Sequence, residues 1–274
     1  MFAFNVYPCT IPQDFASVPL HWQDSVEIIY IKNGEGTVQV DSDIFHAVGG
    51  DIFFVLPGHV HGLRNIARKR MEYENIIFDM SFLGSDSVDI CSQKYFQPIL
   101  GEKIQLPVYI GKNHAEYERV SACLDAADLL SDSRVQGYEL GVKGQMMILF
   151  SVLIQASPGK KAAQESRDMQ KLKKILAKIE QDYDKKLTVT DAAVECGYST
   201  SHFMRWFREM TGTGFAAYLN DFRLERAAFA LRSSDDTVLE IAGKAGFSNL
   251  SNFNRQFKKK FEMCPGVFRK KYLD

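Results

Sequence analysis

The spacing of hydrophobic and polar positions changes along the chain. Up to about residue 82 the apolar residues stand in short runs rich in Val, Ile, Phe and Tyr, separated by NGEG, DSD, GGD and PG. Short runs between glycine and aspartate turns are typical of strands in a sandwich or small barrel. We therefore expect a β domain at the start of the chain, with turns at these four places.

The apolar spacing becomes helical in the middle of the chain. Two amphipathic helices are expected between residues 116 and 156, with DSRVQG as the turn between them. ASPGKKAAQES, which follows, has the small and polar composition of a linker. Beyond it every segment has a helical pattern. The predicted fold class is α+β in two domains, with a domain at 1–156, a linker at 157–166 and an all-α domain at 167–274.

The two parts of the chain also differ in net charge. Residues 166–274 hold 20 Lys and Arg against 14 Asp and Glu, a net of +6, whereas residues 1–165 carry −7. This asymmetry suggests an acidic module joined to one that prefers polyanions. No apolar run is long enough for a membrane span and the N-terminus does not resemble a signal peptide. Five dispersed cysteines without CxxC spacing predict free thiols and a cytoplasmic protein.

The C-terminal part contains an internal repeat. TVTDAAVECGY at 188–198 aligns with TVLEIAGKAGF at 237–247, and FMRWFREMTGT at 203–213 aligns with FNRQFKKKFEM at 253–263. Each copy predicts a short helix, a turn at Gly197 or Gly246, and a second helix capped by Ser199 or by Ser248 and Asn249. This order is that of a helix-turn-helix motif.

Each second helix has an aromatic face and a polar, basic face. Phe203, Phe207 and Met210 should pack inward in the first copy, as should Phe253, Phe257 and Phe261 in the second. A helix-turn-helix inserts its second helix into the major groove of DNA. The residues that we expect at the DNA are Thr200, Ser201, Met204, Arg205 and Arg208 in the first copy, and Asn249, Leu250, Ser251, Asn254, Arg255 and Lys258 in the second.

Residues 169–271 resemble the DNA-binding domain of AraC/XylS-type transcription regulators. The resemblance rests on GYSTSHFMRWFREMTG, FAAYLNDFRLERAAFAL, GFSNLSNFNRQFKKKF and the closing CPGVFR. It implies that the middle segment is a rigid helix, which holds the two recognition helices about one turn of DNA apart. It also implies double-stranded DNA and RNA polymerase as partners. Glu262 departs from the family pattern, which often has glycine there.

HWQDSVEIIYI followed by GGDIFFVLPGHVHGL resembles the cupin-like β-barrel that serves many of these regulators as a sensor domain. In metal-binding cupins the matching positions supply metal ligands, and here they hold His21, Gln23, Glu27 and His61. Glutamine in place of a histidine makes a poor set for a tightly held transition metal. We therefore expect neither a metal nor another cofactor.

A small-molecule pocket is the preferred interpretation of the same residues. If 21–31 is one strand, His21, Gln23, Ser25 and Glu27 share a face because side chains alternate along a strand. Buried polar groups need partners, which a polyhydroxylated effector such as a sugar would supply. The expected effector-binding residues are His21, Trp22, Gln23, Glu27, Tyr30 and His61.

The leading hypothesis is a homodimeric, sequence-specific transcription regulator controlled by a small molecule, without catalytic residues and without a membrane partner. Dimerisation is assigned to the helices at 116–156. One alternative is a metal-dependent cupin enzyme fused to a helical domain, and another is a non-specific architectural DNA-binding protein.

Overall fold

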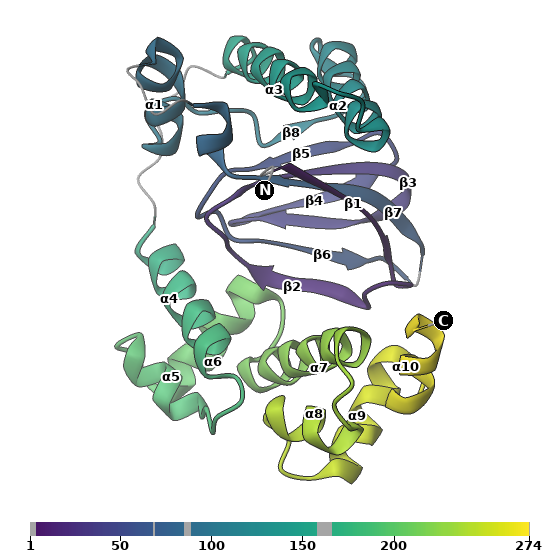
Figure 1. The fold of residues 1–274 in the computed structure, drawn as a ribbon. Helices are drawn as coiled ribbons and strands as arrows, with labels where there is room; N and C mark the ends of the chain where they lie inside the picture. The colour runs from purple at the N-terminus through teal and green to yellow at the C-terminus, as the bar shows by residue number, and fades with distance from the viewer. Residues whose placement is uncertain (1–3, 68, 85–88, 158–165, 274) are drawn as a thin grey trace. The chain divides into compact units, whose positions relative to one another are not determined.

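The computed structural model describes residues 4–67, 69–84, 89–157 and 166–273 (Figure 1). The chain forms two compact units, one of residues before 165 and the other of residues after it together with residues 15–21. Of the linker expected at 157–166, only the two end residues lie within the described ranges, so its boundaries stay a prediction. Among the described residues, no helix combines the length and apolarity needed to cross a membrane.

The β domain expected before residue 82 is confirmed, and one further short strand follows it. The strands are β1 (Phe4–Ile11), β2 (Ser17–His21), β3 (Val26–Val40), β4 (Asp43–Val48), β5 (Ile52–Val55), β6 (His61–Asn65), β7 (Met71–Phe78) and β8 (Tyr109–Ile110). The order β1-β7-β3-β5-β8 forms one path, while β4 and β6 also pair with β3, and β2 pairs with β6.

β3 is the strand that joins the two parts of this sheet. Its first half, from Val26 to Ile31, pairs with β5 and β7, and its second half, from Glu35 to Val40, pairs with β4 and β6. A shift of register between Ile31 and Asn33 marks a bulge at the change. Because the first half is buried on both faces, its sequence is a continuous apolar run interrupted only by Glu27.

The turn expected at NGEG is wrong, because β3 runs straight through it. The glycines serve close packing instead. A Cβ on Gly34, whose φ is +78°, would lie 1.9 Å from the carbonyl oxygen of Arg70, and one on Gly36 would lie 2.8 Å from that of Arg64. Because glycine has no side chain, the backbones of the neighbouring strands can approach β3 closely here, and the strand can form its bulge. The turns at DSD, GGD and PG are confirmed.

The single strand expected at 21–31 is also wrong. β2 ends at His21 and β3 begins at Val26, with an irregular connection between them. In that connection the carbonyl of Gln23 accepts a hydrogen bond from the backbone N–H of Gly58. The backbone of Gln23 is therefore held by a loop contact rather than by the sheet.

Helices cover one face of the sheet, as Figure 1 shows. They are the short η1 (Met80–Leu83), η2 (Ser92–Phe96) and α1 (Gln97–Leu100), followed by α2 (Tyr117–Ser133) and α3 (Tyr138–Gln155). α2 and α3 confirm the two amphipathic helices expected at 116–156. Their buried residues, including Leu124, Met146 and Phe150, join Ile28, Tyr30 and Phe54 of the sheet in one apolar core.

The second unit is helical. Its helices are α4 (Arg167–Asp182), α5 (Val189–Glu195), α6 (Thr200–Thr211), α7 (Phe215–Ser233), α8 (Val238–Lys244), α9 (Leu250–Phe261) and α10 (Pro265–Leu273). α5 with α6, and α8 with α9, are the two helix-turn-helix motifs that the repeat predicts. α7 is the long helix between them (Figure 1). The predicted fold class, α+β with an all-α second domain, is confirmed.

Candidate nucleic-acid interface and ligand site

The second helix of each motif begins at the residue that the sequence predicts. The hydroxyl of Ser199 accepts a hydrogen bond from the backbone N–H of His202 at 3.3 Å, and the side-chain oxygen of Asn249 accepts one from Asn252 at 2.9 Å. These bonds satisfy backbone donors that the first helical turn leaves without partners. Gly197 and Gly246, at φ +67° and +82°, supply the left-handed residue of each turn.

The first helix of each motif is also capped, by a capping box that we did not predict from the sequence. The hydroxyl of Thr188 accepts from the backbone of Asp191, whose carboxylate accepts from the backbone of Thr188. Thr237 and Glu240 form the same reciprocal pair at the start of α8. The signal was present in the repeat as Thr followed three residues later by an acidic residue.

Aromatic side chains fix the second helices to the rest of their motifs. Phe203 and Phe207 in α6, and Phe253 and Phe257 in α9, are fully buried, as predicted. Met210 and Phe261 are half-buried. Trp206 is buried as well and packs between Phe203 and Tyr198, which the sequence reading did not foresee. The aromatic face of α6 is therefore wider than its two phenylalanines, four residues apart, suggest.

The opposite faces of α6 and α9 carry the residues expected at DNA. Exposed on α6 are Ser201, Met204, Arg205 and Arg208, and Thr200 is half-buried. On α9 the exposed residues are Ser251, Arg255 and Lys258, with Asn249 exposed just before the helix and Leu250 and Asn254 half-buried. Arg255 donates to the side-chain oxygen of Asn252 at 3.0 Å, which orients it along the helix surface. Each helix thus presents a polar and basic strip that its aromatic core does not use.

Arg223 of α7 connects the two motifs through hydrogen bonds to the backbone. Its guanidinium donates to the backbone carbonyls of Tyr183 at 2.6 Å and Lys185 at 2.7 Å, which follow the end of α4. Gly246, the turn glycine of the second motif, lies against the same place. A Cβ on Gly246 would be 2.7 Å from the Tyr183 carbonyl oxygen and 2.9 Å from Nε of Arg223. The turn of the second motif therefore packs directly on the backbone that leads into the first.

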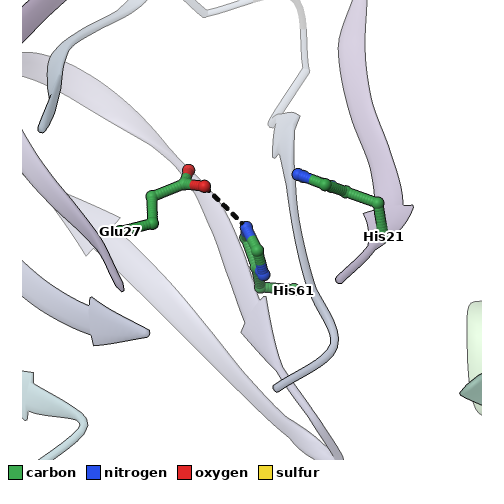
Figure 2. A group of neighbouring side chains, drawn as sticks. All are labelled: His21, Glu27 and His61. Carbon is green, nitrogen blue, oxygen red and sulfur yellow. Dashed lines mark hydrogen bonds and ion pairs between the residues drawn. The ribbon is translucent and has the colours of Figure 1, made fainter. Parts of the chain in front are cut away.

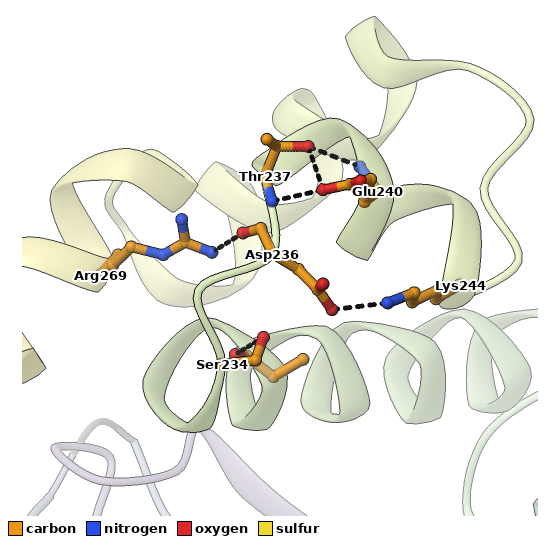
Figure 3. Close-up of polar contacts among 7 residues, drawn as sticks. Ser234, Asp236, Thr237, Glu240, Lys244 and Arg269 are labelled. Carbon is orange, nitrogen blue, oxygen red and sulfur yellow. Dashed lines mark hydrogen bonds and ion pairs between the residues drawn. The ribbon is translucent and has the colours of Figure 1, made fainter.

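The second motif is held from two further directions. Lys260 of α9 pairs with Glu225 of α7 at 3.0 Å, and both side chains are largely buried. Figure 3 shows the start of α8, where Arg269 of α10 donates to the carbonyl of Asp236 and Lys244 pairs with the Asp236 carboxylate at 2.7 Å. The Lys260–Glu225 pair fixes α9 to α7, the Arg269 contact fixes the start of α8 to α10, and the Lys244–Asp236 pair connects the two ends of α8.

The polar group of the β domain contains Glu27 of β3 and His61 of β6, both drawn in Figure 2, together with Gln23 of the connection before β3. Nε2 of His61 lies 2.9 Å from a carboxylate oxygen of Glu27, and Gln23 donates to the same oxygen at 2.8 Å. The side chains of His61 and Glu27 are 0% and 3% exposed.

The two histidines have similar backbone contacts. Nδ1 of His61 lies 3.1 Å from the carbonyl of His59, and Nδ1 of His21 lies 3.0 Å from that of Pro19. Since a carbonyl only accepts, each Nδ1 carries a proton. Burial lowers the pKa of His61, but the hydrogen bond and charge of Glu27 outweigh it, and the net pKa is raised.

Not every expected effector residue joins this group. Tyr30 lies three residues beyond Glu27 on β3, so it points to the other face of the strand. It is buried in the core against the helices, and burial together with Tyr117 raises its pKa. The indole nitrogen of Trp22 is buried without a hydrogen-bond partner among the described residues. The structure thus brings together Gln23, Glu27 and His61, places Tyr30 elsewhere, and assigns His21 to the other compact unit.

Comparisons with known proteins agree with this arrangement. The profile of the AraC-like ligand binding domain matches residues 6–137, and that of a helix-turn-helix domain matches residues 193–271. An uncharacterized HTH-type transcriptional regulator of Bacillus subtilis, YdeC, is 22% identical over 96% of this chain and 90% of its own length. The TetD protein of transposon Tn10 in Escherichia coli is 37% identical over 37% of this chain and 74% of its own.

A solved structure supports the whole fold. ToxT from Vibrio cholerae, in complex with an arylbutenoic acid, superposes with a TM-score of 0.52 over 98% of both chains, at 13% identity. A ligand-binding β domain joined to a helix-turn-helix domain defines a DNA-binding transcription regulator that responds to a small molecule. The chain belongs to the AraC/XylS-type family of these regulators. It is a regulator rather than an enzyme, as the sequence predicts.

Proposed function

We propose that the protein acts as a homodimer, in which α6 and α9 of each chain enter successive major grooves while a ligand in the β domain controls DNA affinity. The observation that carries the proposal is the matched pair of exposed polar strips on α6 and α9. Both helices are capped at their first turn and held by buried aromatic residues. A recognition helix needs this combination of a free outer face and a fixed position.

The residue types on the strips fit DNA. Arg205 and Arg255 occupy the same place in the repeat, and both are exposed. An arginine guanidinium can donate two hydrogen bonds to guanine in the major groove, which discriminates between bases. Lys258 and Arg208 lie further along their helices, where contact with phosphates is the natural role. The net charge of +6 over residues 166–274 adds attraction that does not depend on sequence.

The effector site that we propose is the polar group of the β domain, with Trp22, Gln23, Glu27 and His61 as its residues. Support comes from burial, since Glu27 and His61 lie among apolar strands and are almost completely shielded from solvent. The unsatisfied indole N–H of Trp22 adds a donor. A ligand rich in oxygen atoms, such as a sugar, matches these groups. ToxT was solved with an organic acid, which keeps carboxylates among the candidates.

Dimerisation is proposed for the helices α2 and α3. Leu129 and Leu140 are 71% and 78% exposed, and Ile148 is 50% exposed. Exposed apolar residues mark an interaction surface when they form one contiguous patch, which is what we propose for these three. A contact with RNA polymerase, which the resemblance implies, and a cytoplasmic location, which the dispersed cysteines predict, complete the proposal.

A binding assay on the full chain tests the effector part. Ligands that raise the melting temperature of the full chain are first identified in a panel of sugars, organic acids and metal ions. DNA affinity is then measured at fixed salt with and without each of these ligands, against random competitor DNA. We expect at least one ligand to change specific affinity and to leave non-specific affinity unchanged. A non-specific DNA-binding protein would show equal affinity for all duplexes.

A further inference from the structure

We propose that Arg223 is a positioning residue for DNA recognition, which fixes the spacing of the two DNA segments that α6 and α9 read. The inference rests on the proposed function, because it requires both helices to enter the major groove. It concerns a connection between the two motifs that is separate from the length of α7. This connection leads from the first motif through α4 to the turn of the second motif.

α4 is fixed to the first motif by polar side chains. The hydroxyl of Tyr198, the residue after the turn glycine, donates to the carboxylate of Asp168 at 2.8 Å. The ammonium nitrogen of Lys171 lies 3.8 Å from the centre of the Tyr198 ring, which is a cation–π contact. Lys174 pairs with Glu195 of α5 at 2.8 Å. α4 is therefore held both to α5 and to the turn that precedes α6.

The C-terminal end of α4 is held by α7. The ring of Tyr183, which ends α4, packs edge-to-face on Phe222 with the ring centres 5.5 Å apart, and the guanidinium of Arg226 lies 5.7 Å from its centre. Arg223 donates to the carbonyls of Tyr183 and Lys185. Carbonyls at the end of a helix lack partners within the helix, and the fork of donors on a guanidinium can bind two of them at once.

The turn of the second motif lies against the same guanidinium. A Cβ on Gly246 would be 2.9 Å from Nε of Arg223 and 2.7 Å from the carbonyl oxygen of Tyr183, whereas one on Gly197 would meet nothing within 4 Å. Arg223 therefore lies where the end of α4 meets the turn that leads into α9. The two motifs differ here, because the first turn contacts α4 through the side chain of Tyr198 and the second through its backbone.

Two connections restrict the motifs more than one. A single connecting helix allows two motifs to rock about their contacts with it, and a second connection opposes that motion. One base pair corresponds to about 3.4 Å along the DNA axis and about 35° of rotation. A small change in the relative position of α6 and α9 therefore changes the spacing at which both helices can contact their bases.

A spacing series with the full chain tests the proposal. The duplexes carry the site that the wild type selects from a randomised library, with one or two base pairs inserted or removed between its two segments. We expect the wild type to lose affinity at least about tenfold for a single inserted base pair, because a displaced segment loses base contacts. Arg223→Ala should bind the original site more weakly but lose at most about threefold on the same insertion, because loosely connected motifs can follow the displaced segment.

Two further variants and a folding measurement complete the design. Arg223→Lys keeps the charge, but an ammonium cannot bind both carbonyls as the guanidinium does, so its spacing profile should be intermediate. Lys185→Ala is the matched control, because it keeps the carbonyl that accepts from Arg223 and removes only an exposed side chain, which pairs with Asp182. Its profile should equal that of the wild type. Thermal denaturation gives the folded fraction of each variant, and a lower folded fraction weakens binding by the same factor at every spacing.

The outcomes separate this proposal from the proposed function. A flattened profile for Arg223→Ala, with a wild-type profile for Lys185→Ala, supports the positioning role. A profile of Arg223→Ala that is parallel to that of the wild type, or a wild type that binds equally well at every spacing, overturns that role and leaves the regulatory function standing. If Arg223→Ala does not fold, a parallel profile of Arg223→Lys has the same meaning. A wild type without any preferred sequence refutes the proposed function, and the positioning role with it.

Discussion

At the scale of single residues, the two turn glycines show how equal positions in a repeat acquire different surroundings. Gly197 and Gly246 both have positive φ, of +67° and +82°. A Cβ on Gly197 would meet nothing within 4 Å, whereas one on Gly246 would meet Tyr183, Asp184 and Arg223. The second turn therefore also serves as a packing surface between the motifs.

Replacing these glycines should separate backbone strain from packing. Gly197→Ala should lower the free energy of unfolding by about 1–2 kcal/mol, the cost of a left-handed conformation with a side chain. Gly246→Ala should cost roughly 1–3 kcal/mol more, because the backbone carbonyl of Tyr183 cannot move aside cheaply. Urea denaturation of the full chain, followed by circular dichroism of the helices, measures both.

Gly243→Ala provides the control for this pair. Gly243 lies within α8 and a Cβ there would also meet nothing within 4 Å. Alanine should stabilise that helix by about 0.5–1 kcal/mol. Equal losses for Gly197→Ala and Gly246→Ala would mean that the second turn does not pack on the first motif.

At the scale of elements, α6 and α9 depend on their aromatic faces. Phe207→Ala and Phe257→Ala should each lower the free energy of unfolding by about 3–5 kcal/mol, the usual cost of emptying an aromatic core position. Phe207 contacts Phe203, Phe215 and Tyr218, and Phe257 contacts Phe253, Phe261 and Phe268. Thermal and urea denaturation measure the loss.

The control for both is Phe229→Ala in α7, because Phe229 is 60% exposed. We expect a change within about 0.5 kcal/mol there. A loss at Phe229 as large as at Phe207 would show that exposure does not decide the effect of removing an aromatic ring from these helices.

The helical elements could be predicted from sequence because their signals are local. Caps, turn glycines and the spacing of phenylalanines lie within a dozen residues of one another, and the same signals occur in both copies of the repeat. Trp206 stands three residues after Phe203, a spacing that also places it on the inward face, but it was not counted there. The capping boxes were visible in the repeat but were not used.

The β domain was harder to predict because its decisive contacts are distant in sequence. The two glycines of NGEG have the composition of a turn. Only the folded structure shows that the backbones of Arg64 and Arg70 pack against Gly36 and Gly34. His21 and Glu27 belong to different strands, so strand alternation did not unite them, and His61 comes from a third strand. Because side chains alternate along a strand, Tyr30 had to face away from Glu27, three residues before it. The expected effector-binding residues should therefore not have included Tyr30.

At the scale of the whole molecule, we propose that the exposed aliphatic residues of α2 and α3 form the dimer interface. Leu140→Glu should weaken dimerisation at least about tenfold, or about 1.4 kcal/mol, because a carboxylate would be buried at the interface. Analytical ultracentrifugation of the full chain over a range of concentrations measures the dissociation constant.

Ile44→Glu is the matched control, since Ile44 is 68% exposed on β4 rather than on these helices. It should leave the oligomeric state unchanged. A wild-type chain that sediments as a monomer at all concentrations, or a Leu140→Glu variant that dimerises normally, would remove α2 and α3 from the interface.

The central claim is that α6 and α9 read different segments of one DNA site. Selection of bound duplexes from a randomised library, carried out with the wild-type chain and with Arg205→Ala and Arg255→Ala, tests it most directly. The wild type should enrich a site with two conserved segments about 10 base pairs apart. Each variant should lose preference in a different segment and bind the wild-type site more weakly by about 1–3 kcal/mol. No enriched sequence for the wild type, or loss of the same segment in both variants, would contradict the claim.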